Sequence, residues 1–187
     1  MSKKLNPLLS KFRNLGNNEI NSLEDGAFTD LASLVVLYLA INNITHVKND
    51  SFAGLPKLRQ LNIGFNNILA LGEGKLNLSN LTVLNIVNGQ LTAIKKRDLI
   101  GISTIQKLNL NTNQLNVIYA QNFHNLASLS NLDLRHNTIR NITRNTFFGL
   151  RGLHILTLTE NCIKIIYEDA FIALENLTSL YVTDIIE

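Results

Sequence analysis

Leucine and isoleucine recur along this chain at a nearly constant interval. One position of the pattern is always leucine: Leu37, Leu61, Leu84, Leu108, Leu132, Leu156 and Leu180. The successive spacings are 24, 23, 24, 24, 24 and 24 residues. A fixed period in this range is typical of solenoids, in which each unit buries its apolar side chains only against its neighbours. The pattern therefore predicts a stack of similar coils.

Each unit has two halves with different periodicity. The first half alternates apolar and variable residues, as around Leu132 and Leu134, and this alternation indicates a short strand. The second half places a phenylalanine three residues before a leucine, as in Phe147 and Leu150, which favours a short helical turn. Equivalent strands should stack as a parallel sheet with a spacing of about 4.8 Å. Because the turns are bulkier than the strands, we expect the sheet on the concave side.

A column of asparagines follows the predicted strands: Asn18, Asn42, Asn66, Asn113, Asn137 and Asn161. A carboxamide both donates and accepts hydrogen bonds, so these side chains can bridge backbone groups of adjoining coils at a sharp corner. Gly89 interrupts the column, beside the one spacing of 23 residues. We therefore expect the coil from residue 66 to residue 89 to be the least regular and locally the least stable.

The unit Leu-x-x-Leu-x-Leu-x-x-Asn-x-Ile-x-x-Ile-x-x-x-x-Phe-x-x-Leu, seen at residues 129–150, resembles the 24-residue "typical" class of leucine-rich repeat. The resemblance extends from about residue 15 to the end. It implies an α/β solenoid, a right-handed horseshoe with a parallel sheet on the concave face and short helical turns or loops on the convex face. Similar repeats occur in Toll and Toll-like receptors, Slit, chaoptin and small leucine-rich proteoglycans. The resemblance thus implies a recognition, adhesion or innate-immune receptor protein that works outside the cell or at its surface.

We divide the chain into an irregular N-terminal segment or partial cap, residues 1–13, and a repeat array of about seven and a half units, residues 14–187. Leu5, Leu8, Leu9 and Phe12 have helix-like spacing, so they form either a short amphipathic cap or the remnant of a truncated repeat. The cysteine-rich caps usual in the extracellular relatives are missing. Near the end, Ile185 stands where the column of asparagines, which we call the asparagine ladder, would continue. We interpret the chain as a fragment; the alternative is a partner that covers the last coil.

Composition excludes several other classes. A net charge of +3 gives no basic stripe for nucleic acid. The single cysteine, Cys162, excludes an internal disulfide framework and a cysteine-based zinc site, and we expect it to be partly exposed. No apolar run is long enough to span a membrane, and the start is a poor signal peptide. We therefore keep a cytoplasmic location as the alternative to the extracellular one.

Six Asn-x-Ser/Thr sequons mark possible N-glycosylation sites: Asn43, Asn49, Asn77, Asn80, Asn141 and Asn176. Their number is a mild excess over chance for a chain so rich in asparagine, and it favours an extracellular location.

The variable residues of the first half should project from the concave face, opposite the buried leucines. The early end of this face is apolar and aromatic, and the late end is charged. We predict that it binds a protein ligand or co-receptor through an aromatic anchor and a charged rim, made by Tyr38, Ile41, Phe65, Asp133, Arg135, His136, Glu160 and Tyr181.

Two other functions remain open at this point. The chain could be a cytoplasmic scaffold or regulatory subunit that binds and occludes a partner. A much weaker hypothesis is a metal-assisted hydrolase at His136 and Glu160, with Asp133 and His154 nearby. The face is open, however, and the sequence has no nucleophile elbow, P-loop, dinucleotide fingerprint or His-Glu-x-x-His helix. We therefore expect neither catalysis nor a cofactor.

Overall fold

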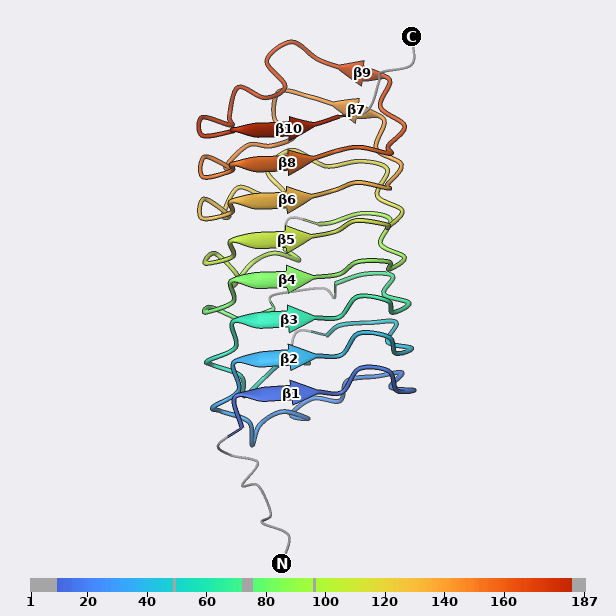
Figure 1. The fold of residues 1–187 in the computed structure, drawn as a ribbon, viewed down its shortest axis with the longest axis vertical. Coiled ribbons are helices and arrows are strands. Elements are labelled where there is room, and N and C mark those ends of the chain that lie inside the picture. Colours follow the sequence, from blue (N-terminus) through green and yellow to red (C-terminus); the bar gives the residue numbers. More distant parts are fainter. Residues whose placement is uncertain (1–9, 49, 72–75, 96, 183–187) are drawn as a thin grey trace, which may run out of the picture.

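The computed structural model describes residues 10–48, 50–71, 76–95 and 97–182, and Figure 1 shows a single stack of coils. Eight short parallel strands form one sheet in the order β1-β2-β3-β4-β5-β6-β8-β10. Their bounds are Phe12–Asn14 (β1), Val36–Tyr38 (β2), Gln60–Asn62 (β3), Val83–Asn85 (β4), Lys107–Asn109 (β5), Asn131–Asp133 (β6), Ile155–Thr157 (β8) and Ser179–Tyr181 (β10). A second, two-stranded sheet pairs β7 (Asn141–Ile142) with β9 (Ile165–Ile166) in parallel.

The leucine column predicted the register of the main sheet. Each central leucine pairs with the next one along the stack, from Leu37 to Leu180. In β1 the equivalent position holds Arg13, which pairs with Leu37. The six leucines from Leu37 to Leu156 are at most 1% exposed, whereas Leu180 is 41% exposed. The core is thus a continuous column of aliphatic side chains, and stability comes from contacts between neighbouring coils.

The predicted helical turns are single hydrogen-bonded turns. The N–H of Leu150 donates to the carbonyl of Phe147 at 3.2 Å, and the same bond joins the equivalent Phe and Leu in three other coils. The part of the chain that the structure describes contains no α-helix. Phenylalanines of neighbouring coils stack inside, with ring centroids 6.2 Å apart for Phe28 and Phe52 and 5.8 Å apart for Phe147 and Phe171.

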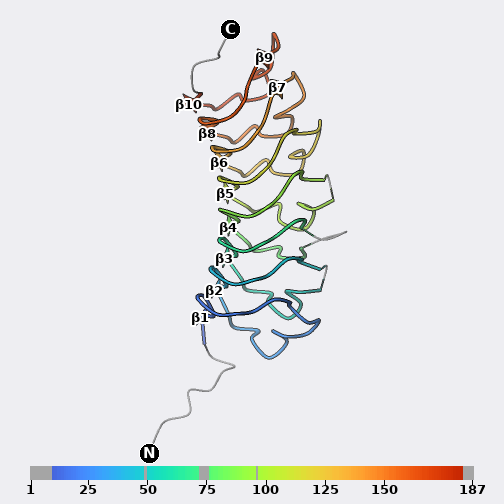
Figure 2. The same cartoon turned by 90° about the vertical axis from the view of Figure 1, so that its right-hand side faces the viewer.

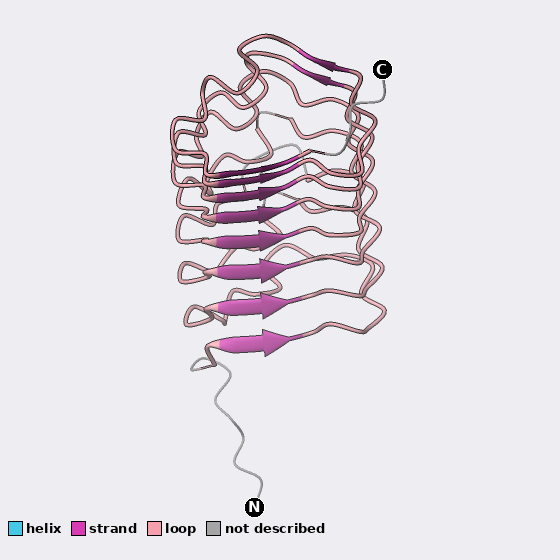
Figure 3. Ribbon diagram, turned by 45° about the horizontal axis from the view of Figure 1, so that its top comes forward, coloured by secondary structure: helices cyan, strands magenta, loops and turns pink. Residues whose placement is uncertain are grey.

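The stack is gently curved, and the sheet lines its concave side, as predicted (Figure 2). Strands of the main sheet occupy one side of every coil, and apart from β7 and β9 the other sides are loops and turns (Figure 3). Phe12 lies in β1 and not in a helix, and it pairs with β2 as part of a first coil, so at this residue the truncated repeat agrees with the structure and the helical cap does not. The other three residues of the helix-like spacing, Leu5, Leu8 and Leu9, lie outside the described part.

The ladder asparagines join each coil to the one before it. Asn137 Oδ1 accepts from the N–H of Leu115 at 3.0 Å, and its Nδ2 donates to the carbonyls of Leu110 and Leu134 at 3.0 and 2.9 Å. Asn42, Asn66, Asn113 and Asn161 make the equivalent bonds. The side chain of Asn18, in the first coil, donates instead to carbonyls of its own coil, those of Leu15 and Gly16. Where the ladder is intact, backbone groups at the corner are paired although water is excluded.

Candidate binding surface

In five strands of the main sheet, the last residue is an asparagine or aspartate that bonds to the backbone just beyond the strand. Side-chain oxygens of this column accept the N–H two residues later, at 2.9–3.2 Å, in Asn14, Asn62, Asn85, Asn109 and Asp133. This local bond holds the backbone that follows the strand. Strands β2 and β8 end at the same position, at Tyr38 and Thr157, so the bond is not required for a strand to end there. Sequence reasoning places this column on the binding face. In the structure, its asparagine side chains bond instead to the backbone of their own coil. The repeated Asn or Asp in one column was the signal that sequence reasoning missed.

The residue before each ladder asparagine lies at the corner of the coil and not in a strand. This column has left-handed backbone, with φ between 51° and 58°, at Ile41, Phe65, Asn88, Thr112, His136 and Glu160. The expectation that these residues belong to the strands was therefore wrong. All six are exposed.

The early end of the sheet carries exposed aromatic and aliphatic side chains. The ring of Phe12 meets that of Tyr38 edge to face, with centroids 5.4 Å apart and an interplanar angle of 83°. Phe12 is 51% exposed, and at the adjoining corners Ile41 and Phe65 are 54% and 51% exposed. Sequence reasoning missed Phe12, because this residue precedes the first clear unit of the pattern. At the opposite end of the sheet Tyr181 is 54% exposed.

The charged end is partly self-paired. The Arg135 guanidinium contacts Asp133 Oδ2 through Nη2 at 2.8 Å and Nε at 3.0 Å. Asn111 Nδ2 donates to the same oxygen at 3.3 Å, so the Asp133 carboxylate is occupied by its neighbours. His136 is exposed at the corner, and His154 bonds locally to the carbonyl of Gly152 at 2.8 Å.

The hydrolase hypothesis receives no support from this arrangement. Within the described ranges, no group of three His, Cys, Asp or Glu side chains could hold a metal ion. The Asp133 carboxylate, which the hypothesis would need as a ligand or base, is already engaged by Arg135.

A shallow hollow of about 310 Å³ lies on the strand face over β4, β5, β6 and β8. Aliphatic and polar side chains alternate around it, including Val83, Lys107, Asn131, Asp133, Ile155 and Thr157. The strand face therefore has an aromatic early end and a mixed depression whose lining includes the charged Asp133.

Two of the six sequons have a structural role. Asn80 Nδ2 donates to the carbonyl of Pro56 at 2.8 Å, and Thr82 Oγ1 donates to the carbonyl of Arg59 at 3.0 Å. Asn176 and Thr178 make the same pair of bonds to the coil before them, at 2.7 and 3.0 Å. The repeated Asn-Leu-Thr is therefore a clamp between coils.

The remaining sequon residues differ in their settings. Asn43, Asn77 and Asn141 are exposed, and Asn49 lies outside the described residues. Cys162 is exposed, beside the corner of its coil.

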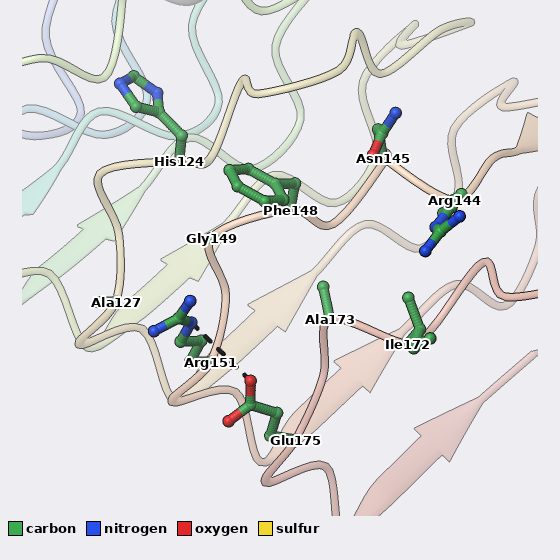
Figure 4. Close-up of a pocket in the computed structure, with 10 residues that line it drawn as sticks. All are labelled: His124, Ala127, Arg144, Asn145, Phe148, Gly149, Arg151, Ile172, Ala173 and Glu175. Atoms are coloured by element: carbon green, nitrogen blue, oxygen red, sulfur yellow. Dashed lines mark ion pairs between the residues drawn. The ribbon is translucent and has the colours of Figure 1, made fainter.

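A larger hollow, of about 650 Å³, lies on the turn side of the last coils, away from the strands (Figure 4). Phe148 and Ile172, 48% and 57% exposed, line it together with Arg144. Arg151 and Glu175 form an exposed ion pair at its rim, with Nε and Oε1 3.8 Å apart. Sequence reasoning missed this hollow. The signal for it is the apolar residue that directly follows the core phenylalanine in two coils: Phe148 follows Phe147, and Ile172 follows the partly buried Phe171.

Comparison with known proteins agrees with this architecture. A segment of 85 residues is 35% identical to human leucine-rich repeats and immunoglobulin-like domains protein 1, covering 44% of this chain and 8% of that protein. A segment of 78 residues is 36% identical to bovine osteomodulin, covering 42% of this chain and 18% of osteomodulin. The solved structure of TLR13 in complex with ssRNA13 superposes with a TM-score of 0.87 at 28% identity, over 92% of this chain and 25% of that one.

This chain thus spans a small part of each of these proteins. No helix in its described part could cross a membrane. The family model for the leucine rich repeat matches residues 14–68, 79–139 and 128–184, which together are most of the sequence. The chain belongs to the leucine rich repeat family.

Proposed function

We propose that this chain is a non-catalytic module that binds a protein ligand on its concave strand face, within an extracellular or cell-surface recognition protein. The observation that carries the proposal is the apolar early end of the sheet, where Phe12 and Ile41 are half exposed and the partly buried Tyr38 packs against Phe12. Large aromatic side chains on a preorganised surface lose little conformational entropy on binding and bury much apolar area. The half-exposed Arg135 supplies a charged contact at the other end.

A protein ligand fits this surface better than a nucleic acid does. TLR13 was solved with an RNA bound, but the strand face of this chain is mostly neutral and its Arg135 is already paired with Asp133. Phosphate backbones require clusters of unpaired cations for affinity. The sequence similarity to osteomodulin and to human leucine-rich repeats and immunoglobulin-like domains protein 1 supports the receptor-type context.

The test uses the chain fused to an antibody Fc region on an array of purified extracellular proteins. Three forms are compared: the unaltered chain, the strand-face variant Tyr38→Ala with Arg135→Glu, and the turn-side variant Phe148→Ala as matched control. We expect at least one array protein to bind the unaltered chain and the Phe148→Ala form, and to lose at least tenfold in affinity for the strand-face variant. Binding that survives the strand-face changes, or no binding at all, would refute the proposal.

The extracellular location is tested separately by secretion from animal cells and enzymatic removal of N-glycans. A mobility shift that disappears in Asn141→Gln or in Thr45→Ala, which removes the Asn43 sequon, supports it. Absence of any glycan on the secreted protein counts against it.

A further inference from the structure

A polar hollow of about 400 Å³ opens at the corner of the second, third and fourth coils, beside the end of the strands. Its outer surface is formed by four carboxamide side chains and one aromatic ring: Asn43, Asn67, Asn88, Gln90 and Phe65. The described residues that line it include no ionisable side chain. A charged ligand would find no counter-charge here, so the hollow suits an uncharged, strongly hydrogen-bonding one.

The carboxamides of the outer surface have unused hydrogen-bonding capacity. Gln90 Nε2 donates to Asn67 Oδ1 at 3.1 Å, which fixes the two amides side by side. Gln90 Oε1 and Asn67 Nδ2 make no bond to other described residues, nor do the side chains of Asn43 and Asn88. Each amide carries two donor hydrogens and an acceptor oxygen, so the hollow offers alternating donors and acceptors to a ligand.

The floor of the hollow is preorganised by the ladder. Asn42 and Asn66 lie there with their amides fully engaged by backbone groups of two coils each. Gly89 lies where the next ladder asparagine would be, so no side chain occupies that position. The break in the ladder therefore coincides with the hollow, and the rigid corners on both sides hold its shape.

We propose that this corner hollow, which we call the amide hollow, binds a neutral oligosaccharide. Hydroxyl groups of a sugar donate and accept like water, and they match the alternating amide groups. Phe65 is 51% exposed at the edge, and its ring face can stack on the apolar C–H face of a sugar ring. A peptide backbone could also pair with amides, but it offers fewer polar groups per unit area than a sugar does.

The amide hollow lies beyond the strand ends, and its occupation stands independently of protein binding on the strand face. The sugar could come from a free glycan or from a glycan attached to Asn43 itself, since Asn43-Ile-Thr is a sequon at the edge. The chemistry of recognition is the same for both sources, and the experiment separates them.

The test is saturation-transfer NMR on protein made in bacteria, which carries no N-glycan. The probes are maltose, lactose, cellobiose and N,N'-diacetylchitobiose, with the tripeptide N-acetyl-Gly-Ser-Gly-amide, whose blocked ends carry no charge, as the competing class. We expect transfer to at least one sugar, reduced at least fivefold in Phe65→Ala and in Gln90→Ala. Gln114→Ala is the matched control, because Gln114 has the same place in the next coil but does not line the hollow.

All the altered side chains are exposed, so each variant should keep the fold, and circular dichroism checks this. Transfer to none of the sugars overturns the proposal. So does a signal that survives Phe65→Ala and Gln90→Ala, an equal loss in Gln114→Ala, or equal transfer to the tripeptide. In glycosylated protein from animal cells, loss of sugar binding that Thr45→Ala restores identifies the Asn43 glycan as the occupant; unchanged binding identifies a free sugar.

Discussion

Gly89 interrupts the asparagine ladder. Placing an asparagine there therefore measures how much one ladder asparagine contributes to the free energy of unfolding. In the intact coils an asparagine accepts the N–H of a buried residue in the coil before, as Asn137 does for Leu115. The equivalent N–H at the gap belongs to Ile68, which is 0% exposed and receives no side-chain acceptor, since Gly89 has none. We therefore predict that Gly89→Asn stabilises the protein.

The magnitude follows from what the new amide adds. Pairing a buried N–H that lacked a partner contributes about 1–3 kcal/mol. The new Nδ2 contributes less, because the carbonyls of Ile63 and Ile86 already accept from Asn66 and Asn113 at 3.0 and 2.8 Å.

A steric cost opposes this gain. A Cβ at residue 89 would lie 2.7 Å from Asn113 Oδ1, so that amide must move by several tenths of an ångström. The bond from Leu91 N–H to Asn113 Oδ1 is 3.2 Å, the longest of the ladder acceptor bonds, so the move should cost little. We expect a net stabilisation of about 1–2 kcal/mol.

Thermal and urea unfolding of Gly89→Asn, Gly89→Ala and the unaltered chain provide the measurement. The alanine variant meets the same crowding and the same reduction of backbone entropy in the unfolded chain, but it adds no amide. The difference between the two variants therefore isolates the new hydrogen bonds. For a chain of this size, 1–2 kcal/mol corresponds to a rise in melting temperature of about 2–8 °C. An asparagine variant no more stable than the alanine variant would refute the role we give to the ladder. Slower hydrogen exchange at the Ile68 amide would locate the effect.

Two further predictions concern other positions of the repeat. Burial raises the pKa of the Asp98 carboxyl above its ordinary value of 3.8, more than the N–H and charge of Lys95 lower it. The folded state therefore binds this proton more tightly, and stability present below pH 3.8 is lost as pH rises through the raised pKa. Asp98→Ser introduces the residue found at the equivalent Ser51, whose hydroxyl accepts the N–H of Lys48 at 2.8 Å. The stability of this variant relative to the unaltered chain should increase as pH rises. Urea unfolding at pH 3 and pH 7 tests this. Ile41→Asn should stabilise by about 1 kcal/mol, because a β-branched residue is strained at φ 58° and Asn tolerates left-handed backbone; an unchanged urea midpoint would contradict it.

The sequence predicted the interior of the fold well and the corner poorly. The strands of the main sheet are shorter than the alternating pattern suggested, so residues beyond the strand ends were assigned to strands. Burial imposes a strict pattern on the central leucines, so their column gave the correct pairing of the main-sheet strands from β2 to β10, but not that of β7 with β9. Beyond the strand ends, side chains such as Asn62 and Asn109 accept the N–H two residues later and hold the backbone. The alternating pattern does not reveal where the strands end. It was extended to Ile41 and His136, which lie outside the strands.

The candidate site was less predictable because exposure does not reveal which polar groups remain available. Tyr38, Phe65 and Arg135 could be proposed from their columns, but the pairing of Arg135 with Asp133 depends on rotamers that the pattern does not encode. Phe12 was overlooked because the coil that it begins has an arginine, Arg13, in the leucine position. The hollow around Phe148 arises from three coils, and no single repeat contains it.

Asparagine shows how one residue type divides between fold and function in this chain. Asn137 is buried and its amide bonds to backbone groups of two coils, so it can offer nothing to a ligand. Asn109 turns the chain at a strand end through one local bond. Asn88, at the corner beside the gap in the ladder, makes neither kind of bond. Because an amide that is already satisfied gains little from a ligand, recognition should concentrate where the ladder is broken. In the described coils, the ladder is broken at Gly89. We therefore expect a sugar to bind in the amide hollow and not at the regular corners.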